Sequence, residues 1–192
     1  MELSKRQNYS PLNKITIITP SYRIYNLQKL KNSINFDYVD EWIIVYDQTK
    51  VQENPDLFKN NSKIKEYCYL GEGISGNPQR NYAMTKVTNP DTMIYYLDDD
   101  NIINPYMYKL LDVIDNTKIY TFNQVNGLKG NDIRVGHIDT AMFMVPYSLC
   151  KNETWLINIY EADGIFIEKC YRANMNKHIF VDRELCYCNK LA

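Results

Sequence analysis

Met93-Ile-Tyr-Tyr-Leu-Asp98-Asp99-Asp100-Asn101 is the stretch that decides the fold of this 192-residue chain. The apolar run at 93–97 predicts a buried β-strand, and three aspartates follow it without a break. Adjacent carboxylates repel one another, and core packing does not call for them. In an open α/β sheet, ligands bind outside the carboxyl ends of the strands. The stretch therefore predicts an α/β sheet with a ligand site where this strand ends.

Strand-like and helical patterns alternate along the rest of the chain, which favours an α/β layer architecture. Further strands are expected at 14–19, 42–46, 64–70, 118–122 and 179–188, with Pro20 ending the first of them. Helices are expected at 27–34, 77–84, 104–114 and 163–171, with Asn26 and Asn77 as N-caps of the first two. No repeat or linker divides the chain, so residues 1–192 are expected to form a single domain, one that would also fit a piece of a longer protein.

Composition excludes several classes of protein. The net charge is -1 at pH 7, which gives no overall attraction for nucleic acid, and no nucleic-acid partner is expected. The start of the chain lacks the apolar core of a signal peptide, and no apolar run approaches the ~20 residues of a transmembrane helix. A cytoplasmic protein is expected. The odd number of cysteines, five, predicts reduced thiols.

Polar side chains follow three predicted strands at their carboxyl ends: Tyr22, Asp47 and the aspartates from Asp98. These side chains are expected to line one crevice. Alternate residues of an extended segment face the same side, so Asp98 and Asp100 are predicted to address one Mg²⁺ or Mn²⁺ ion. Asp99 is then expected to brace the loop or to meet another part of the ligand. The alternative is a solvated acidic turn.

Two segments near residue 80 suggest a site for an anion. Arg80 lies on the first turn of a predicted helix, where the helix dipole and a guanidinium both favour phosphate. Taken alone, however, this segment favours an exposed surface arginine. The preceding Gly71-Glu-Gly-Ile-Ser-Gly76 has the spacing of a dinucleotide-binding loop. It follows the third predicted strand and not the first, so a flexible loop beside the site is the preferred interpretation.

Carboxylates also occur outside the strand ends. Glu161 and Asp163 stand at the start of the last predicted helix, where a general base would be well held, or where Asp163 would simply cap the helix. His137 and Asp139 are spaced to line a cavity together. The chain has no phosphate-binding loop of the G-x-x-x-x-G-K-[ST] type and no H-E-x-x-H zinc motif.

Taken together, four segments resemble the GT-A class of nucleotide-sugar glycosyltransferases, in particular the inverting beta-glucuronyltransferases. They are Ile18-Thr-Pro-Ser-Tyr22-Arg23, Trp42-Ile-Ile-Val-Tyr-Asp47, Gln79-Arg80-Asn81-Tyr-Ala and Tyr96-Leu-Asp98-Asp99-Asp100-Asn101, with a looser match at 137–143. The chain is also similar in size and composition to small glycosyltransferase domains of large algal viruses. The resemblance implies a GT-A (Rossmann-like) domain with a central, mostly parallel sheet flanked by helices.

The resemblance also implies a role for individual residues. Pro20 and Tyr22 would flank the uracil and ribose, Asp47 would accept a hydrogen bond from the base, and Arg80 would hold the nucleotide. Asp98 and Asp99 would contact the ribose or donor sugar, Asp100 with Asp98 would bind Mn²⁺ or Mg²⁺, and Asp139 would lie beside the transferred sugar. Asp163 would be the catalytic base, with Glu161 as its rival. Donor selectivity is expected to depend on the 127–140 loop and on residues near Trp155.

The predicted function is metal-dependent transfer of a sugar, with inversion, from a UDP-sugar to a hydroxyl of a glycan, glycoprotein or other acceptor. Three alternatives stay open. A nucleotidyltransferase that forms sugar nucleotides also uses acidic metal ligands, but its glycine- and lysine-bearing loop after the first strand is absent here. The others are a non-enzymatic module stabilised by a cation, and an oxidoreductase that binds a dinucleotide at 71–76.

Overall fold

A mixed β-sheet organises the chain in the computed structural model, which describes residues 13–51 and 55–192. In this part of the chain the sheet has eight strands in the order β3-β2-β1-β4-β7-β6-β8-β5. The strands are β1 Ile15–Ser21, β2 Val39–Asp47, β3 Ile64–Tyr69, β4 Met93–Tyr96, β5 Ile102–Ile103, β6 Ile119–Gln124, β7 Phe143–Pro146 and β8 His178–Tyr187. The α-helices are α1 Ile24–Ser33, α2 Asn77–Met84, α3 Tyr106–Leu111, α4 Tyr147–Cys150 and α5 Ala162–Arg172.

The order of the strands creates a crevice at a defined place. Strands β3, β2, β1 and β4 are parallel, and the chain runs outward from β1 to β3 before it returns to the other side of β1 as β4. In an open α/β sheet, a reversal of strand order of this kind places a crevice at the carboxyl ends of the two strands involved, here β1 and β4. The 22–23 segment and the aspartates at 98–100 follow β1 and β4, so both lie at this crevice.

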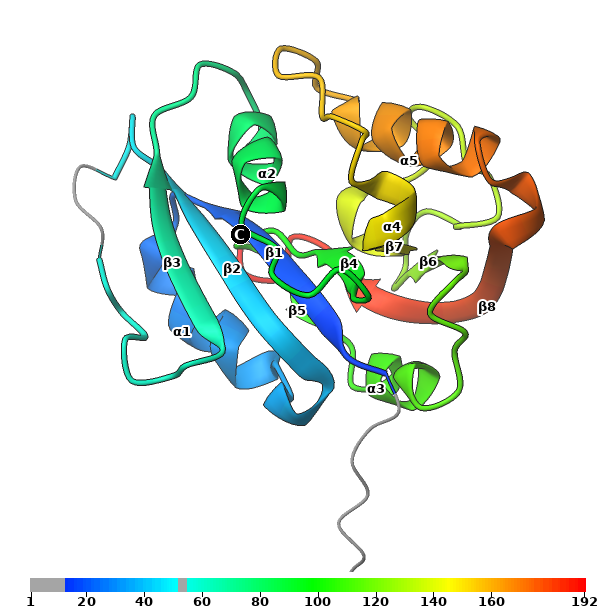
Figure 1. The fold of residues 1–192 in the computed structure, drawn as a ribbon, viewed down its shortest axis with the longest axis horizontal. Coiled ribbons are helices and arrows are strands. Elements are labelled where there is room, and N and C mark those ends of the chain that lie inside the picture. Colours follow the sequence, from blue (N-terminus) through cyan, green and yellow to red (C-terminus); the bar gives the residue numbers. More distant parts are fainter. Residues whose placement is uncertain (1–12, 52–54) are drawn as a thin grey trace, which may run out of the picture.

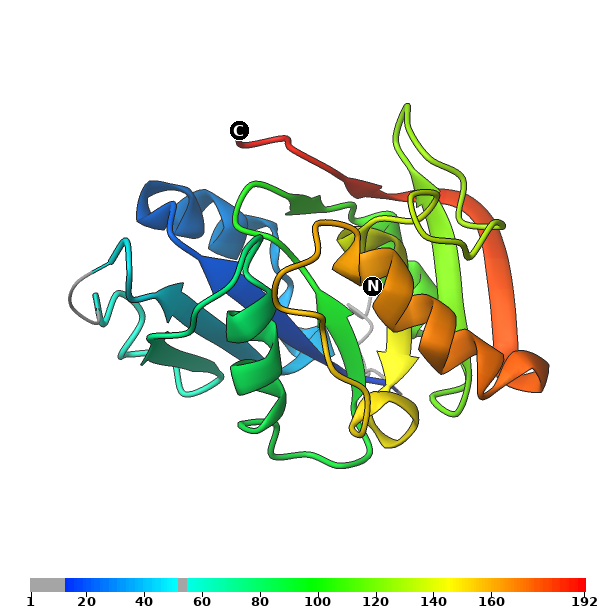
Figure 2. The same cartoon turned by 90° about the horizontal axis from the view of Figure 1, so that it is seen from above.

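The other half of the sheet is mixed. Strand β7 is antiparallel to β4 and to β6, β8 is parallel to β6, and β5 is antiparallel to β8. Helices α2 and α5 cover one face of the sheet and α1 covers the other (Figures 1 and 2). Apolar side chains of β1, β2, β4 and β7 are fully buried between these layers. The expected α/β domain with a mostly parallel sheet flanked by helices is therefore confirmed.

Three details differ from the expectations at the level of single residues. Pro20 does not end β1 but lies within it, opposite Val45 of β2. Proline is tolerated there because the ladder with β4 ends at Ile18, so no partner on that side needs its missing N–H. Asn26 is not an N-cap, because α1 begins earlier, at Ile24; its buried amide instead donates to the carbonyl of Leu191, 3.1 Å away.

The start of α2 also differs from the sequence-based prediction. Gly76, with φ of 76°, is the N-cap, and Asn77 is the first residue of the helix. A side chain on Gly76 would meet the ring of Pro20 at 2.6 Å, so this close approach of loop and strand requires glycine. Pro78 lies in the first turn, as expected.

The carboxyl-terminal segment returns to the crevice. Strand β8 ends at Tyr187, and Cys188 follows it directly. A hydrogen bond with Cys186 is the first cause that raises the pKa of the Cys188 thiol. The cysteines are free thiols, as expected. The backbone N–H of Leu191 donates to the carbonyl of Asp100, 2.8 Å away, which ties this segment to the aspartates.

No helix within 13–51 and 55–192 has both the length and the apolar character needed to cross a bilayer. The signal-peptide prediction concerns residues 1–12, which lie outside the described part of the chain.

Candidate active site

Two joined compartments form a cleft at the carboxyl ends of β1, β2 and β4. The larger has a volume of about 520 Å³ and the smaller about 270 Å³. The residues that line the larger compartment include Pro20, Tyr22, Asp47, Asp98, Asp99, Asp100 and Asp139. Those of the smaller include Arg80, Asp98, Asp139, Glu161 and Asp163. The residues given a catalytic, nucleotide-binding or metal-binding role from the sequence therefore line one cleft, and Asp98 and Asp139 belong to both compartments.

Asp99 joins the ends of β1 and β4. Its carboxylate accepts hydrogen bonds from the hydroxyl of Ser21 and from the backbone N–H groups of Tyr22 and Arg23, at 2.8–3.0 Å. The Arg23 guanidinium adds contacts of 2.7 and 2.6 Å to its other oxygen. The residue is only 1% exposed. Asp99 thus braces the crevice, which is one of the two roles expected from its position.

Asp98 and Asp100 extend the acidic cluster toward the cleft. Asp100 pairs with Arg23 at 2.7 Å, and Asp98 pairs with Arg80. Burial raises the pKa of both carboxyls, and neighbouring carboxylates raise it further, whereas the paired arginine opposes the shift in each case. The described part of the chain holds no group of three acidic, histidine or cysteine side chains arranged to enclose a metal.

Tyr22 and Asp47 form the outer wall of the larger compartment. Tyr22 is about half exposed, and the ammonium of Lys50 lies 4.0 Å from the centre of its ring. Asp47 accepts hydrogen bonds from the backbone N–H and the hydroxyl of Thr49, at 3.0 and 2.6 Å. Tyr22 thus presents a flat ring face beside a carboxylate, an arrangement that suits a planar heterocycle with N–H groups.

The glycine-rich segment 71–76 is a loop that lines the larger compartment, as the preferred interpretation expected. Its Ile74 N–H donates to the carbonyl of Ile157, 2.8 Å away. A side chain on Gly73 would meet that same carbonyl at 2.7 Å. The loop therefore carries glycine where it packs against the 151–161 segment.

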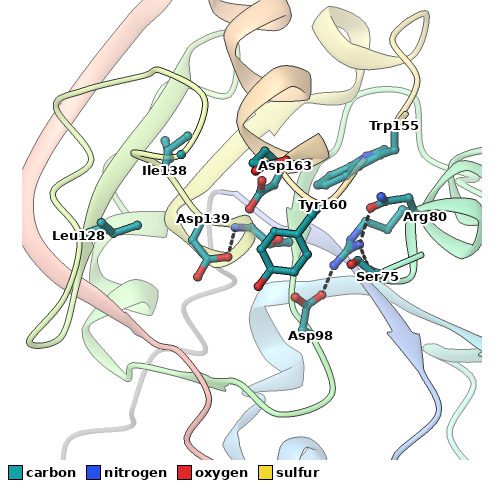
Figure 3. Close-up of a pocket in the computed structure, with 13 residues that line it drawn as sticks. Ser75, Arg80, Asp98, Leu128, Ile138, Asp139, Trp155, Tyr160 and Asp163 are labelled. Carbon is teal, nitrogen blue, oxygen red and sulfur yellow. Dashed lines mark hydrogen bonds and ion pairs between the residues drawn. The ribbon is translucent and has the colours of Figure 1, made fainter. Parts of the chain in front are cut away.

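Arg80 is held at the junction of the two compartments. Its two terminal nitrogens bind the carboxylate of Asp98, the carbonyl of Ser75 and the amide oxygen of Asn77. Its guanidinium carbon lies 4.6 Å from the centre of the Trp155 ring. Figure 3 shows the two side chains next to each other. The side chain is buried, and its Nε has no hydrogen-bond partner among the described residues. Arg80 is thus a buried anchor, not an exposed surface arginine.

The segment 151–161 depends on α2 for its position, and the sequence carried no signal for this contact. The side-chain amide of Asn81 pairs with the backbone of Trp155, donating at 2.9 Å and accepting at 2.8 Å. The side chain of Asn77 donates to the carbonyls of Leu156 and Ile159 at 3.1 and 3.0 Å. Two asparagines on one helix therefore position the segment that leads to Glu161 and Asp163.

The carboxylates of Asp98, Asp139 and Asp163 lie around the smaller compartment (Figure 3). Burial is the main cause that raises the pKa of Asp163 to about 6, and Asp139 and Asp98 add to it. The Gly164 N–H, 2.7 Å away, opposes the shift. Asp139 is held by the Gln124 amide at 2.8 Å and by the Thr140 N–H at 2.6 Å. Asp163 is consequently the carboxylate whose affinity for a proton is adjusted toward neutral pH.

His137 does not join the site. Its ring is about half exposed and lies 3.1 Å from Asp132, away from both compartments. Other lining residues had no assigned role in the sequence, among them Arg23, Lys50, Tyr160 and Asn189. Asn189 carried no sequence signal, because it reaches the cleft through the pairing of β8 with distant strands. Trp155 and the 127–140 loop do line the smaller compartment, as expected.

Comparison with known proteins gives similarity at the level of structure only. No family model and no curated protein matches the sequence. Solved structures do match. TarS 1–349 of S. aureus in complex with UDP-GlcNAc has a TM-score of 0.68 and 17% identity over 91% of this chain and 58% of that one. Glucosyl-3-phosphoglycerate synthase of Mycobacterium tuberculosis, in complex with Mn²⁺, UDP and glucosyl-3-phosphoglycerate, has a TM-score of 0.58 and 10% identity over 91% and 71%.

A third similar structure is the glycosyltransferase GlyE of Streptococcus pneumoniae, with a TM-score of 0.51 and 12% identity over 88% of this chain and 45% of that one. The chain spans about 60% of the length of TarS 1–349. These structures are GT-A glycosyltransferases, so the chain has the GT-A fold expected from its sequence.

Proposed function

We propose that this chain is a metal-dependent glycosyltransferase, which transfers a sugar from a UDP-sugar to a hydroxyl group and inverts the anomeric centre. The observation that carries the proposal is the two-compartment cleft, in which Asp98 and Asp139 line both parts. One compartment offers a flat ring and a carboxylate for a nucleotide base. The other offers a carboxylate of raised pKa, Asp163, beside space for sugars.

The larger compartment would hold the nucleotide. Tyr22 and Pro20 would flank the uracil and ribose, and Asp47 would accept a hydrogen bond from the base N–H. Structures of the same fold support this assignment, because TarS and the phosphoglycerate synthase were crystallised with UDP-GlcNAc and with UDP. Asp99 already accepts hydrogen bonds from several protein donors, so it would only shape the crevice. Asp98 would make the direct contacts with the ribose or donor sugar.

A divalent cation fits the charges of this compartment. Its lining holds five carboxylates (Asp47, Asp98, Asp99, Asp100, Asp139) against the two cations Arg23 and Lys50. A diphosphate would be repelled by this excess unless a cation came with it. Mg²⁺ and Mn²⁺ favour one or two carboxylates together with phosphate oxygens, which suits Asp100 and Asp98. When bound, the ion would stabilise the charge that develops on the departing UDP.

Asp163 would be the general base. As a carboxylate it accepts the proton of the acceptor hydroxyl while that oxygen attacks the anomeric carbon from the face opposite UDP. Attack from the opposite face inverts the configuration. Burial holds the pKa of Asp163 at about 6, which makes it a stronger base than an exposed aspartate and leaves it ionised at neutral pH. Glu161, the rival base, is exposed at the entrance of the same compartment.

Isothermal titration calorimetry tests this proposal directly. UDP is expected to bind in the presence of Mn²⁺ and to bind at least ~10-fold more weakly after chelation, because the diphosphate then meets uncompensated carboxylates. Asp100→Ala is expected to abolish the effect of Mn²⁺. Asp91→Ala, in the turn before β4 and outside the cleft, is the matched control and is expected to behave like the unmodified protein. Failure of UDP to bind with Mn²⁺ would overturn the proposal.

A further inference from the structure

The smaller compartment has an unusual balance of charge. Among the described residues that line it are four carboxylates, from Asp98, Asp139, Glu161 and Asp163, and a single cation, Arg80. Arg80 is only 3% exposed, and its terminal nitrogens are already bound to protein oxygens. Its Nε has no partner among the described residues but is buried, so an incoming carboxylate or phosphate would find no accessible guanidinium here. The compartment therefore opposes anions, even though its neighbour must accept a diphosphate.

Nearby cations do not change this balance. Arg134, on the loop that carries Gly136 and Ile138, is paired with Asp132 on the exposed side of that loop. Lys50 and Arg23 line only the larger compartment, where they contact Asp47 and Asp99. Apart from the buried and paired Arg80, the positive charges of the cleft thus lie in the part that would hold the nucleotide.

The remaining surfaces of the smaller compartment suit uncharged, hydroxyl-rich molecules. Tyr160 is 78% exposed and lines both compartments, and Figure 3 shows its ring between Asp98, Asp139 and Asp163. Trp155, Leu128 and Ile138 add apolar surface. Exposed rings pack against the C–H faces of a sugar, and carboxylates accept hydrogen bonds from its hydroxyls. A neutral sugar could use both kinds of contact without meeting a like charge.

We infer that this compartment admits uncharged sugars and discriminates against sugars that carry a carboxylate or a phosphate. The inference rests on the proposed function and concerns the sugars on both sides of the transfer. Although the sequence motifs resemble those of beta-glucuronyltransferases, a hexuronic acid would place its carboxylate among four others. The transferred unit is therefore a neutral sugar, and Tyr160 is a residue that determines this specificity.

A comparison of neutral and acidic sugar donors tests the inference. UDP-glucose, UDP-galactose and UDP-N-acetylglucosamine would be compared with UDP-glucuronic and UDP-galacturonic acid by the kcat/KM of UDP release with Mn²⁺. The best neutral donor is expected to exceed the best acidic donor by about 100-fold, because a like charge at close range is costly in a partly buried site. Equal or better use of an acidic donor would overturn the inference. Failure of the proposed function looks different, because UDP itself would then not bind.

A substitution at Glu161 tests whether the carboxylates cause the preference for neutral donors. Glu161→Gln is expected to reduce the preference for neutral donors by about 5-fold, since it removes one of the four carboxylates. Asp91→Asn makes the same chemical change outside the cleft and is expected to leave the preference as it was. An equal preference in both variants would contradict the role of charge.

Tyr160→Ala is expected to raise the KM of the neutral donor more than it raises the Kd of UDP. Tyr160→Phe keeps the ring and is expected to leave both the KM and the Kd unchanged. Because Tyr160 is exposed, neither change should unfold the protein. An unchanged KM in Tyr160→Ala would remove Tyr160 from the specificity site.

Discussion

The two ends of the cleft treat a buried carboxylate in opposite ways. Asp99, between the ends of β1 and β4, receives hydrogen bonds from a hydroxyl, two backbone N–H groups and the guanidinium of Arg23. Asp163, at the start of α5, accepts one hydrogen bond within the described part of the chain, from the Gly164 N–H, and has other carboxylates nearby. The same chemical group is thus saturated at one end of the cleft and poorly compensated at the other.

This difference distinguishes a carboxylate that supports the structure from one that can react. A carboxylate with all its acceptor sites filled has little to offer a substrate, but it holds two strand ends at a fixed spacing. A poorly compensated carboxylate binds a proton more readily and is suited to take one from a hydroxyl. The comparison therefore assigns the shape of the crevice to Asp99 and, under the proposed function, the proton transfer to Asp163.

The largest expected effect is on the rate of sugar transfer, after substitution of Asp163. Asp163→Asn should lower kcat by 10² to 10⁴-fold, the usual contribution of a general base, without weakening UDP binding. Transfer is to be measured by UDP release with a sugar acceptor, and binding by calorimetry. If Glu161→Gln loses transfer and Asp163→Asn does not, the base is Glu161.

The pH dependence of the unmodified protein sharpens the same assignment. Because the pKa of Asp163 is raised to about 6, the carboxylate is protonated below this value and cannot accept another proton. The rate of transfer should therefore fall about tenfold per pH unit below pH 6 and level off above it. A rate that stays constant down to pH 4.5 would contradict a base of raised pKa.

The next effect is on stability, at the saturated end. Asp99→Asn should lower the free energy of unfolding by about 3 kcal/mol, because it leaves the partly buried Arg23 without its main partner. Urea denaturation followed by circular dichroism measures this loss. Asp47→Asn is the control at another strand end: its ion pair with Lys50 is long and partly exposed, so a change below about 1 kcal/mol is expected. If both variants lost the same free energy of unfolding, Asp99 would have no special structural role.

The smallest effect concerns the link between the two ends. Asn81→Ala removes two hydrogen bonds to the backbone of Trp155 and should cost about 2 kcal/mol of stability. Because the 151–161 segment leads to Asp163, kcat should fall several-fold while the Kd of UDP stays constant. Thr85→Ala, at the other end of the same helix and exposed, is the control. Loss of UDP binding in Asn81→Ala would show that the helix supports the nucleotide compartment instead.

Much of the fold could be predicted because the signals are local. The β-branched and apolar runs at 15–19, 42–46 and 93–96 are long enough to predict central strands, and they became β1, β2 and β4. The errors are also local. Asn26 and Asn77 have the side chains of N-caps, but each makes a hydrogen bond to a distant carbonyl, and these tertiary contacts outweighed capping.

By itself, the sequence determined which residues gather at the carboxyl edge of the sheet, because strand polarity places Tyr22, Asp47 and Asp98 on one side. Tertiary structure alone decided what each carboxylate does there. The donors that saturate Asp99, the burial that raises the pKa of Asp163 and the approach of Asn189 all come from segments far apart in the chain. Solvation and hydrogen bonding are properties of the assembled neighbourhood, and a residue's chemical identity does not contain them.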